Sequence, residues 1–123
     1  LEVAGRHFAL DSWHHEAVVD AVVGFVRDMC SDEHRARVVA RHHLLGEGLV
    51  RPELKAAFDA QLAAFVGLVS SKMSEAGYPA TVASAELFAM SVDGLLTRQV
   101  VIGVEPLADE EIPRIVSIIA RRW

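Results

Sequence analysis

The most restrictive feature of this sequence is a long apolar helical segment that carries an Asp-Gly pair in its middle. The segment is expected to start near Pro79 or Ala80 and to end at Ile102. Asp93-Gly94 is typical of a turn, but the residues on both sides continue one helical pattern without a change of phase. Apolar side chains cover almost the whole circumference, and such a helix is buried on more than one side. We therefore expect it to pack on its own core and on a second subunit.

The polar residues of this segment need partners if they are buried. Glu86, Asp93 and Thr97 form a narrow polar seam. Because a buried aspartate must be paired or hydrogen-bonded, Asp93 is expected to face an interface, a wet cavity or the rim of the core. Gly94 costs about 1 kcal/mol of helix propensity. Since it has no Cβ, we expect it to let another helix approach closely.

Helical periodicity, without any sustained alternation typical of strands, predicts an all-α fold of five helices. The expected ranges are about 12–30, 32–45, 52–76, the segment described above, and a last helix that opens after Pro106 and continues to Trp123. The expected N-caps are Asp11 or Ser12, Ser31 or Asp32, and Asp109 for the first, second and last of these helices. Pro52 suits the first helical position of the third helix.

The composition is more apolar than one small domain needs. Hydrophobic residues make up 52% of the 123 residues and the mean hydropathy is +0.29, both high for a small soluble monomer. Charges interrupt every apolar run before it reaches the roughly eighteen residues of a membrane span. A partner protein, and no membrane, is therefore expected to cover the excess. We expect one domain over residues 1–123 that forms a homodimer and, since the chain starts at Leu1, belongs to a longer protein.

Charge and cysteine content narrow the function further. The formal net charge of −5 and the isoelectric point of about 5.6 make this chain, by itself, a poor candidate for nucleic-acid binding. The single cysteine, Cys30, cannot form an internal disulfide and fits a reducing compartment such as the cytoplasm.

Six histidines raise the question of a metal site: His7, His14, His15, His34, His42 and His43. Adjacent histidines on a helix point about 100° apart and cannot share one ion. None of the common metal-ligand spacings is present, and the serines and the cysteine have no obvious catalytic base nearby. We therefore expect no metal, no cofactor and no catalytic residues.

A ligand pocket in an all-α domain is an apolar core with a gap. The candidate lining residues are Phe25, Met29, His43, Phe58, Leu62, Phe65, Phe88 and Val92. His43 falls in a sparse apolar stripe with Ala36, Val39 and Ala40. It is either a histidine satisfied by a neighbour or by solvent, or a polar group that orients a ligand in an apolar cavity.

The segment Leu87-Phe-Ala-Met-Ser-Val-Asp-Gly-Leu-Leu96 resembles the corresponding helix in the C-terminal domain of TetR-type transcriptional regulators. The helix that ends at Gly77, the following Tyr78-Pro79 and the closing helix over residues 110–123 are similar to that arrangement as well. The resemblance covers the chain from about residue 11 to its end. It implies an effector-binding and dimerisation domain whose last two helices pair with their copies in a second subunit.

The resemblance also implies where the interface lies and what the chain lacks. The expected interface residues are Asp93, Gly94, Thr97, Val100, Ile112, Ile115 and Ile119. Nothing in this chain resembles the family's helix-turn-helix, so DNA binding is expected only through an N-terminal domain outside it. The resulting hypothesis is the sensing domain of a repressor that binds a small, mostly apolar effector. The alternatives are a helical-bundle metal-binding protein or enzyme that uses the histidines, and a helical interaction module without a ligand.

Overall fold

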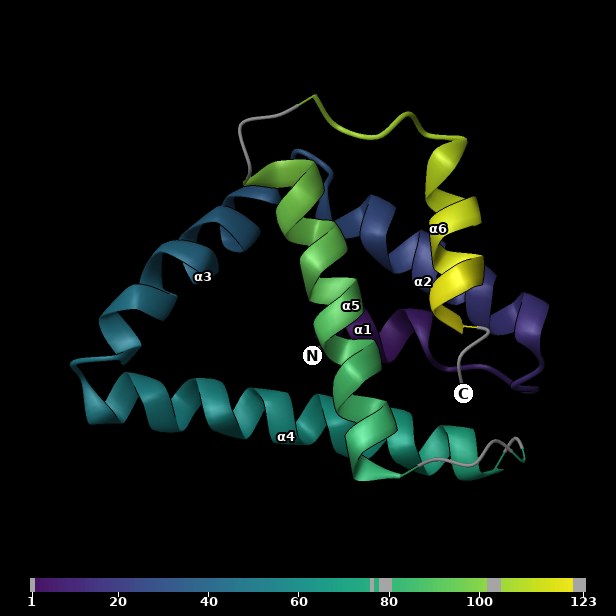
Figure 1. Cartoon of the computed structure of the whole chain (residues 1–123), viewed down its shortest axis with the longest axis horizontal. Coiled ribbons are helices and arrows are strands. Elements are labelled where there is room, and N and C mark those ends of the chain that lie inside the picture. Colours follow the sequence, from purple (N-terminus) through teal and green to yellow (C-terminus); the bar gives the residue numbers. More distant parts are fainter. Residues whose placement is uncertain (1, 76, 78–80, 102–104, 121–123) are drawn as a thin grey trace.

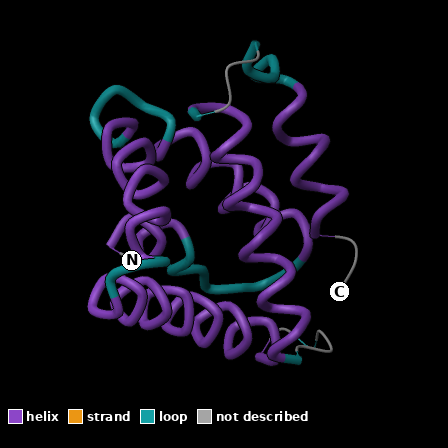
Figure 2. Tube along the Cα trace, turned by 60° about the vertical axis from the view of Figure 1, so that its left-hand side comes forward, coloured by secondary structure: helices purple, strands orange, loops and turns teal. Residues whose placement is uncertain are grey.

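The computed structural model describes residues 2–75, 77, 81–101 and 105–120, and every regular element among them is an α-helix (Figure 1 and Figure 2). The helices are α1 (Glu2–His7), α2 (His15–Met29), α3 (Arg35–Gly48), α4 (Pro52–Glu75), α5 (Val82–Val100) and α6 (Glu111–Ala120). The prediction of an all-α fold is confirmed. The expected number of five helices is too low by one.

The additional helix is α1, which has only six residues and includes Gly5. Isolated helices shorter than about 12–15 residues are marginal in water, so no local signal predicts it. It forms because Val3, Ala4 and the following Phe8 are buried in the core. Tertiary packing therefore stabilises a helix that its own sequence does not.

The expected N-caps of α2 and α3 are wrong, because these helices begin at His15 and Arg35, a few residues later than expected. Neither helix has a side-chain hydrogen bond at its N-cap. The Ser31 hydroxyl instead donates to the carbonyl oxygen of Asp28 at 2.6 Å. It thus closes the end of α2 and does not start α3.

The starts of the later helices agree with the sequence to different degrees. α4 begins at Pro52, as expected. α5 is preceded by a capping box, in which the side chains of Thr81 and Ser84 each accept a hydrogen bond from the backbone N–H of the other residue. Asp109 does not act as the expected cap: it accepts a hydrogen bond from Arg27 of α2 at 3.1 Å. α2 ends at Met29, close to the expected position, whereas α3 continues to Gly48, about three residues beyond its expected end. The expected helix ends at Ala76, Pro79 or Ala80, Ile102 and Trp123 lie outside the described residues.

α2 and α5 form the centre of the core. α1 and α6 pack on α2, while α3, α4 and α5 contact one another in pairs and form the sides of a triangle (Figure 1). On α2, Val22 and Val26 are fully inaccessible to solvent. Ala85 of α5 and Val116 of α6 are equally inaccessible, and one apolar cluster includes residues from all six helices.

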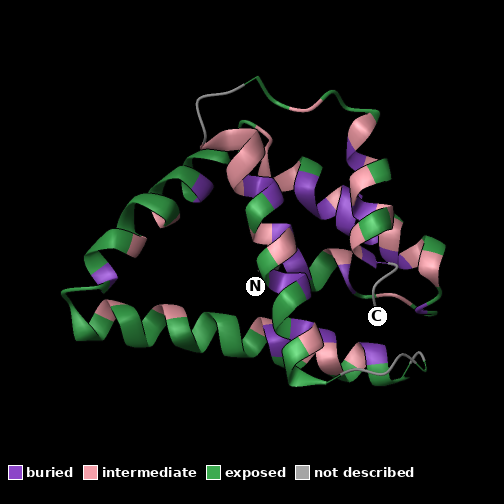
Figure 3. Ribbon diagram, viewed as in Figure 1, coloured by how far each residue is buried: buried purple, intermediate pink, exposed green. Residues whose placement is uncertain are grey.

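α3 and the first half of α4 are far more exposed than the rest of the chain (Figure 3). On α3 the buried residues are Val38 and Gly48. The stripe around Val39 that was expected to be apolar and inward faces solvent within this protomer. The helix is therefore rotated relative to the orientation that its sparse apolar residues predict.

The connection from α5 to α6 is fixed by a side chain. The Gln99 amide donates through Nε2 to the carbonyl oxygen of Leu107 at 3.2 Å, and the Leu107 N–H donates to Oε1 at 2.7 Å. Arg98 adds a bond from Nη1 to the carbonyl oxygen of Glu105 at 2.7 Å. The position of Gln99 near the end of α5 is thus explained by a loop whose backbone groups it satisfies.

Candidate functional site

Asp93 is paired within the protomer. Its Oδ1 accepts a hydrogen bond from Nη1 of Arg41 on α3 at 3.0 Å, and both side chains are roughly half exposed. The Thr97 hydroxyl donates to the Asp93 carbonyl oxygen at 2.9 Å. The charge in the middle of α5 therefore lies at the rim of the core, where it connects α5 to the weakly buried α3.

Gly94, next to Asp93, has no close neighbour within the protomer. A Cβ built on it would meet nothing within 4 Å, so no helix of the same protomer approaches it closely. Ala83, Leu87, Met90 and Gly94 are all exposed and follow one another at intervals of four, three and four residues. This spacing is that of a coiled-coil seam, which places all four on one face of α5. We call this set the outward stripe.

The outward stripe carries large apolar side chains that the protomer leaves uncovered. Leu87 is 59% exposed and Met90 is 65% exposed. On α6, Ile118 is 46% exposed. Scattered exposed apolar residues are ordinary, but a row of them on one helix face marks an interaction surface.

The residues expected at a dimer interface differ in how exposed they are within the protomer. Gly94 is exposed, and Asp93 and Thr97 lie beside it on the polar seam. Ile112 is buried within the protomer. The other three expected residues, Val100, Ile115 and Ile119, are half-buried and pack against the core.

The residues expected to line a pocket differ in how far they are buried within the protomer. Phe25, Phe88 and Val92 are buried in the core. Met29, Phe58 and Phe65 are half-buried, whereas Leu62 and His43 are exposed.

An aromatic cluster joins two of these residues through one that the sequence reading missed. The ring of Phe8 lies 6.0 Å from that of Phe25 and 6.1 Å from that of Phe65, measured between ring centres. It also stacks on Trp13 at 5.9 Å. Trp13 Nε1 is buried and has no hydrogen-bond partner among the residues described. Phe8 follows α1, so no helical period pointed to it.

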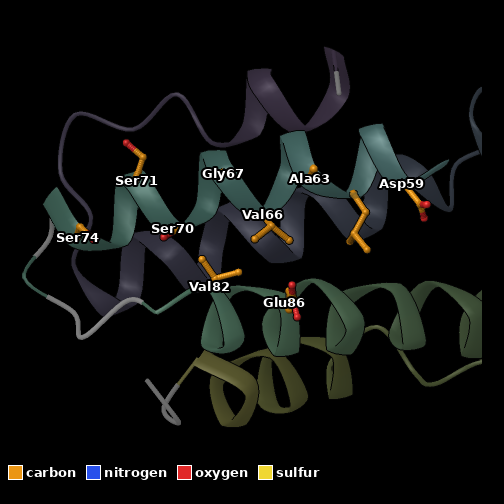
Figure 4. Close-up of a pocket in the computed structure, with 10 residues that line it drawn as sticks. Asp59, Ala63, Val66, Gly67, Ser70, Ser71, Ser74, Val82 and Glu86 are labelled. Atoms are coloured by element: carbon orange, nitrogen blue, oxygen red, sulfur yellow. The ribbon is translucent and has the colours of Figure 1, made fainter. Parts of the chain in front are cut away.

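A groove of about 580 Å³ lies between α4 and α5 (Figure 4). Val66 of α4 and Val82 of α5 point toward each other across the space between the two helices, and Leu62 and Glu86 also line the groove. Serine hydroxyls line the end of the groove that is nearest the C-terminus of α4, and Asp59 lies at the other end. Of the residues expected to line a pocket, Leu62 is the one that lines this groove.

A second polar cluster ties α1 to the end of α2. Asp28 Oδ2 is 3.0 Å from His7 Nε2, and Oδ1 is 3.4 Å from Nε2 of the buried His34. The hydrogen bond to His7, with further support from the positive charge of His34 and Arg6, lowers the pKa of the Asp28 carboxyl although partial burial opposes this. Within the described part of the chain, no three His, Cys, Asp or Glu side chains converge in a way that could hold a metal ion.

Comparison with known proteins gives one match. The family model described as the tetracyclin repressor-like C-terminal domain matches residues 13–121. Neither the comparison with curated proteins nor that with solved structures gives a match. No helix in the described ranges is long and apolar enough to cross a membrane.

Proposed function

This chain belongs to the family of tetracyclin repressor-like C-terminal domains, and we propose that it is the effector-binding and dimerisation domain of a TetR-type repressor. Its attached helix-turn-helix domain would read DNA in the cytoplasm. A small, mostly apolar effector would change the relative orientation of two such domains. Binding to two half-sites one DNA turn apart depends on that orientation.

The observation that carries this proposal is the outward stripe on α5. Ala83 and Gly94 are small and Leu87 and Met90 are large, a combination that lets a second helix pack closely along the stripe. In a two-fold dimer each copy offers the same surface, so the stripe meets its own counterpart. Ile118 of α6 is a further large apolar residue that the protomer leaves exposed.

The proposed interface is therefore centred on the outward stripe of α5, and not on the isoleucines of α6 that the sequence suggested. Ile112 already contributes to the protomer core, so its replacement tests folding more than association. Leu87 and Met90 contribute little to that core because most of their surface is exposed. They are therefore the better residues with which to test association.

The test is sedimentation velocity of the wild type and of the double variant Leu87→Glu/Met90→Glu. We expect the wild type to sediment as a dimer of the 13.4 kDa chain. The variant should be monomeric, because association would bury four carboxylates without partners. Leu49→Glu is the matched control, since Leu49 is 86% exposed in the turn after α3 and should leave the dimer unchanged. A monomeric wild type, or a dimeric double variant, contradicts the proposal.

A further inference from the structure

We propose that the groove between α4 and α5 is the effector site, and that it selects ligands with an apolar body and a cationic head group. This inference rests on the proposed function above for its biological meaning. The volume of about 580 Å³ is typical of small-molecule sites, which are mostly apolar with a few polar groups. The chemistry of its walls indicates which ligand it takes.

The apolar part of the groove comes from both helices. Val66 forms a buried floor, and Leu62 and Val82 stand exposed on either side of it. Ala63 and Gly67 on α4 are small and leave the space above the floor open. A Cβ built on Gly67 would meet nothing within 4 Å, so this position has room for ligand atoms. An apolar group that enters here covers Leu62 and Val82, which the protomer leaves exposed.

The charge in the groove is negative. Its two ionisable lining residues, Asp59 and Glu86, are both carboxylates. Asp59 is already paired with Lys55 at 2.6 Å, one helical turn away. The Glu86 side chain is exposed and has no ion pair or side-chain hydrogen bond to any described residue. A ligand cation next to Glu86 therefore gains an attraction that a neutral or anionic head group does not.

The groove is separate from the outward stripe. On α5, the polar seam of Glu86, Asp93 and Thr97 lies between Val82, which lines the groove, and Met90, which belongs to the stripe. A small ligand in the groove and a second copy on the stripe can therefore be bound at the same time. This separation allows the two proposals to be tested independently.

The first experiment compares three probes with the same apolar body: 4-phenylbutylammonium, 4-phenylbutanol and 4-phenylbutyrate. Titrations followed by backbone amide NMR of the wild type give both the binding site and the dissociation constants. We expect shifts along α4 and the start of α5. The ammonium should bind about threefold to fivefold more tightly than the alcohol, because an exposed ion pair contributes up to about 1 kcal/mol. The butyrate should bind most weakly, and added salt should reduce the differences.

The second experiment changes the groove. Glu86→Gln should remove the preference for the ammonium over the alcohol and leave the affinity for the alcohol unchanged. Glu16→Gln on α2 is its control, because Glu16 is exposed and does not line the groove. Gly67→Leu should weaken all three probes at least about tenfold by filling the space. Its control is Gly46→Leu on α3, where a Cβ also meets nothing within 4 Å.

Three results would overturn the inference: equal affinity for the ammonium and the butyrate, an unchanged preference in Glu86→Gln, or unchanged probe binding in Gly67→Leu. A fourth would replace it. If Gly67→Leu disrupts the dimer and leaves probe binding intact, the groove is part of the subunit interface. Sedimentation of the ligand-free wild type tests dimerisation without reference to the groove, so failure of either proposal is recognised separately.

Discussion

Replacing Gly94 with leucine should stabilise each protomer and at the same time weaken the dimer. Gly94 lies inside α5, where a Cβ would meet nothing within 4 Å of its own chain. Leucine is a much better helix former than glycine, by up to about 0.8 kcal/mol. In a chain of 123 residues, a gain of that size raises Tm by about 3–5 °C. The isolated protomer should therefore become more stable.

The dimer should respond in the opposite direction. Packed helices lie about 8–10 Å apart, and small residues at the contact allow the closer distances. Overpacking a close contact costs about 1–3 kcal/mol, and a two-fold interface contains the substitution twice. The combined cost of about 2–6 kcal/mol raises the dissociation constant at least about thirtyfold.

Two assays separate these effects. Sedimentation velocity over a concentration series gives the dissociation constant. Urea unfolding well below that constant gives the stability of the protomer alone, since dimerisation makes apparent stability depend on concentration. Gly46→Leu on α3 is the matched control, because its site is equally open and helical. It should gain stability without any change in association.

The reasoning is refuted if Gly94→Leu gains stability and dimerises as tightly as the wild type, because Gly94 would then not be covered in the dimer. A less stable protomer would contradict a different step, namely that the site is open within one chain.

Three further predictions concern contacts within the protomer. In a double-mutant cycle of Arg41→Ala and Asp93→Ala, the coupling energy should be about 0.2–1 kcal/mol, because both side chains are roughly half exposed. Added salt should lower this energy. A cycle with no coupling at low salt would show that the pair contributes nothing. Because the pKa of Asp28 is lower in the folded state, this residue contributes stability above its ordinary pKa, and that stability is lost as the pH falls from the ordinary pKa towards the folded-state pKa. In Asp28→Asn, the urea midpoint should therefore fall less steeply than in the wild type below about pH 4. An unchanged slope would contradict this. Phe8→Ala should cost about 3–5 kcal/mol in urea unfolding, since Phe8 is buried at the centre of the aromatic cluster; a cost below about 1 kcal/mol would be at odds with that position.

The sequence was sufficient for the features that depend on local periodicity. The arc on α2 with Val22 and Val26 repeats with the helical period, so it predicts both a helix and its buried face. The same holds for the broad face of α5, where Phe88, Val92 and Leu96 are buried as their spacing indicates. Pro52 marks the start of α4 because its fixed backbone angle and missing N–H suit the first helical turn.

Other features depend on contacts between distant residues and could not be predicted in this way. Arg41 pairs with Asp93, 52 positions away in the sequence, and no helical period indicates such a contact. α1 and Phe8 are ordered by the core that they complete, so their own sequence carries no sign of it. On α3 the apolar residues are too few to fix the rotation of the helix, and the contacts of Val38 decide it. The groove requires the relative placement of α4 and α5, which no periodicity supplies.

The Asp-Gly pair in α5 separates two surfaces of one helix. Adjacent residues on a helix point about 100° apart, so Asp93 faces α3 while Gly94 faces outward. Glu86, in the groove, lies on the same seam as Asp93. A shift of α5 against α3 and α4 therefore moves the groove, the ion pair and the outward stripe together. If ligand binding and dimerisation both use this helix, linkage requires that they alter each other by the same factor. The factor by which 4-phenylbutylammonium changes the dimer dissociation constant per site should then equal the factor by which dimerisation changes the affinity for that probe. A dimer dissociation constant that does not change at saturating 4-phenylbutylammonium would contradict a coupling through α5.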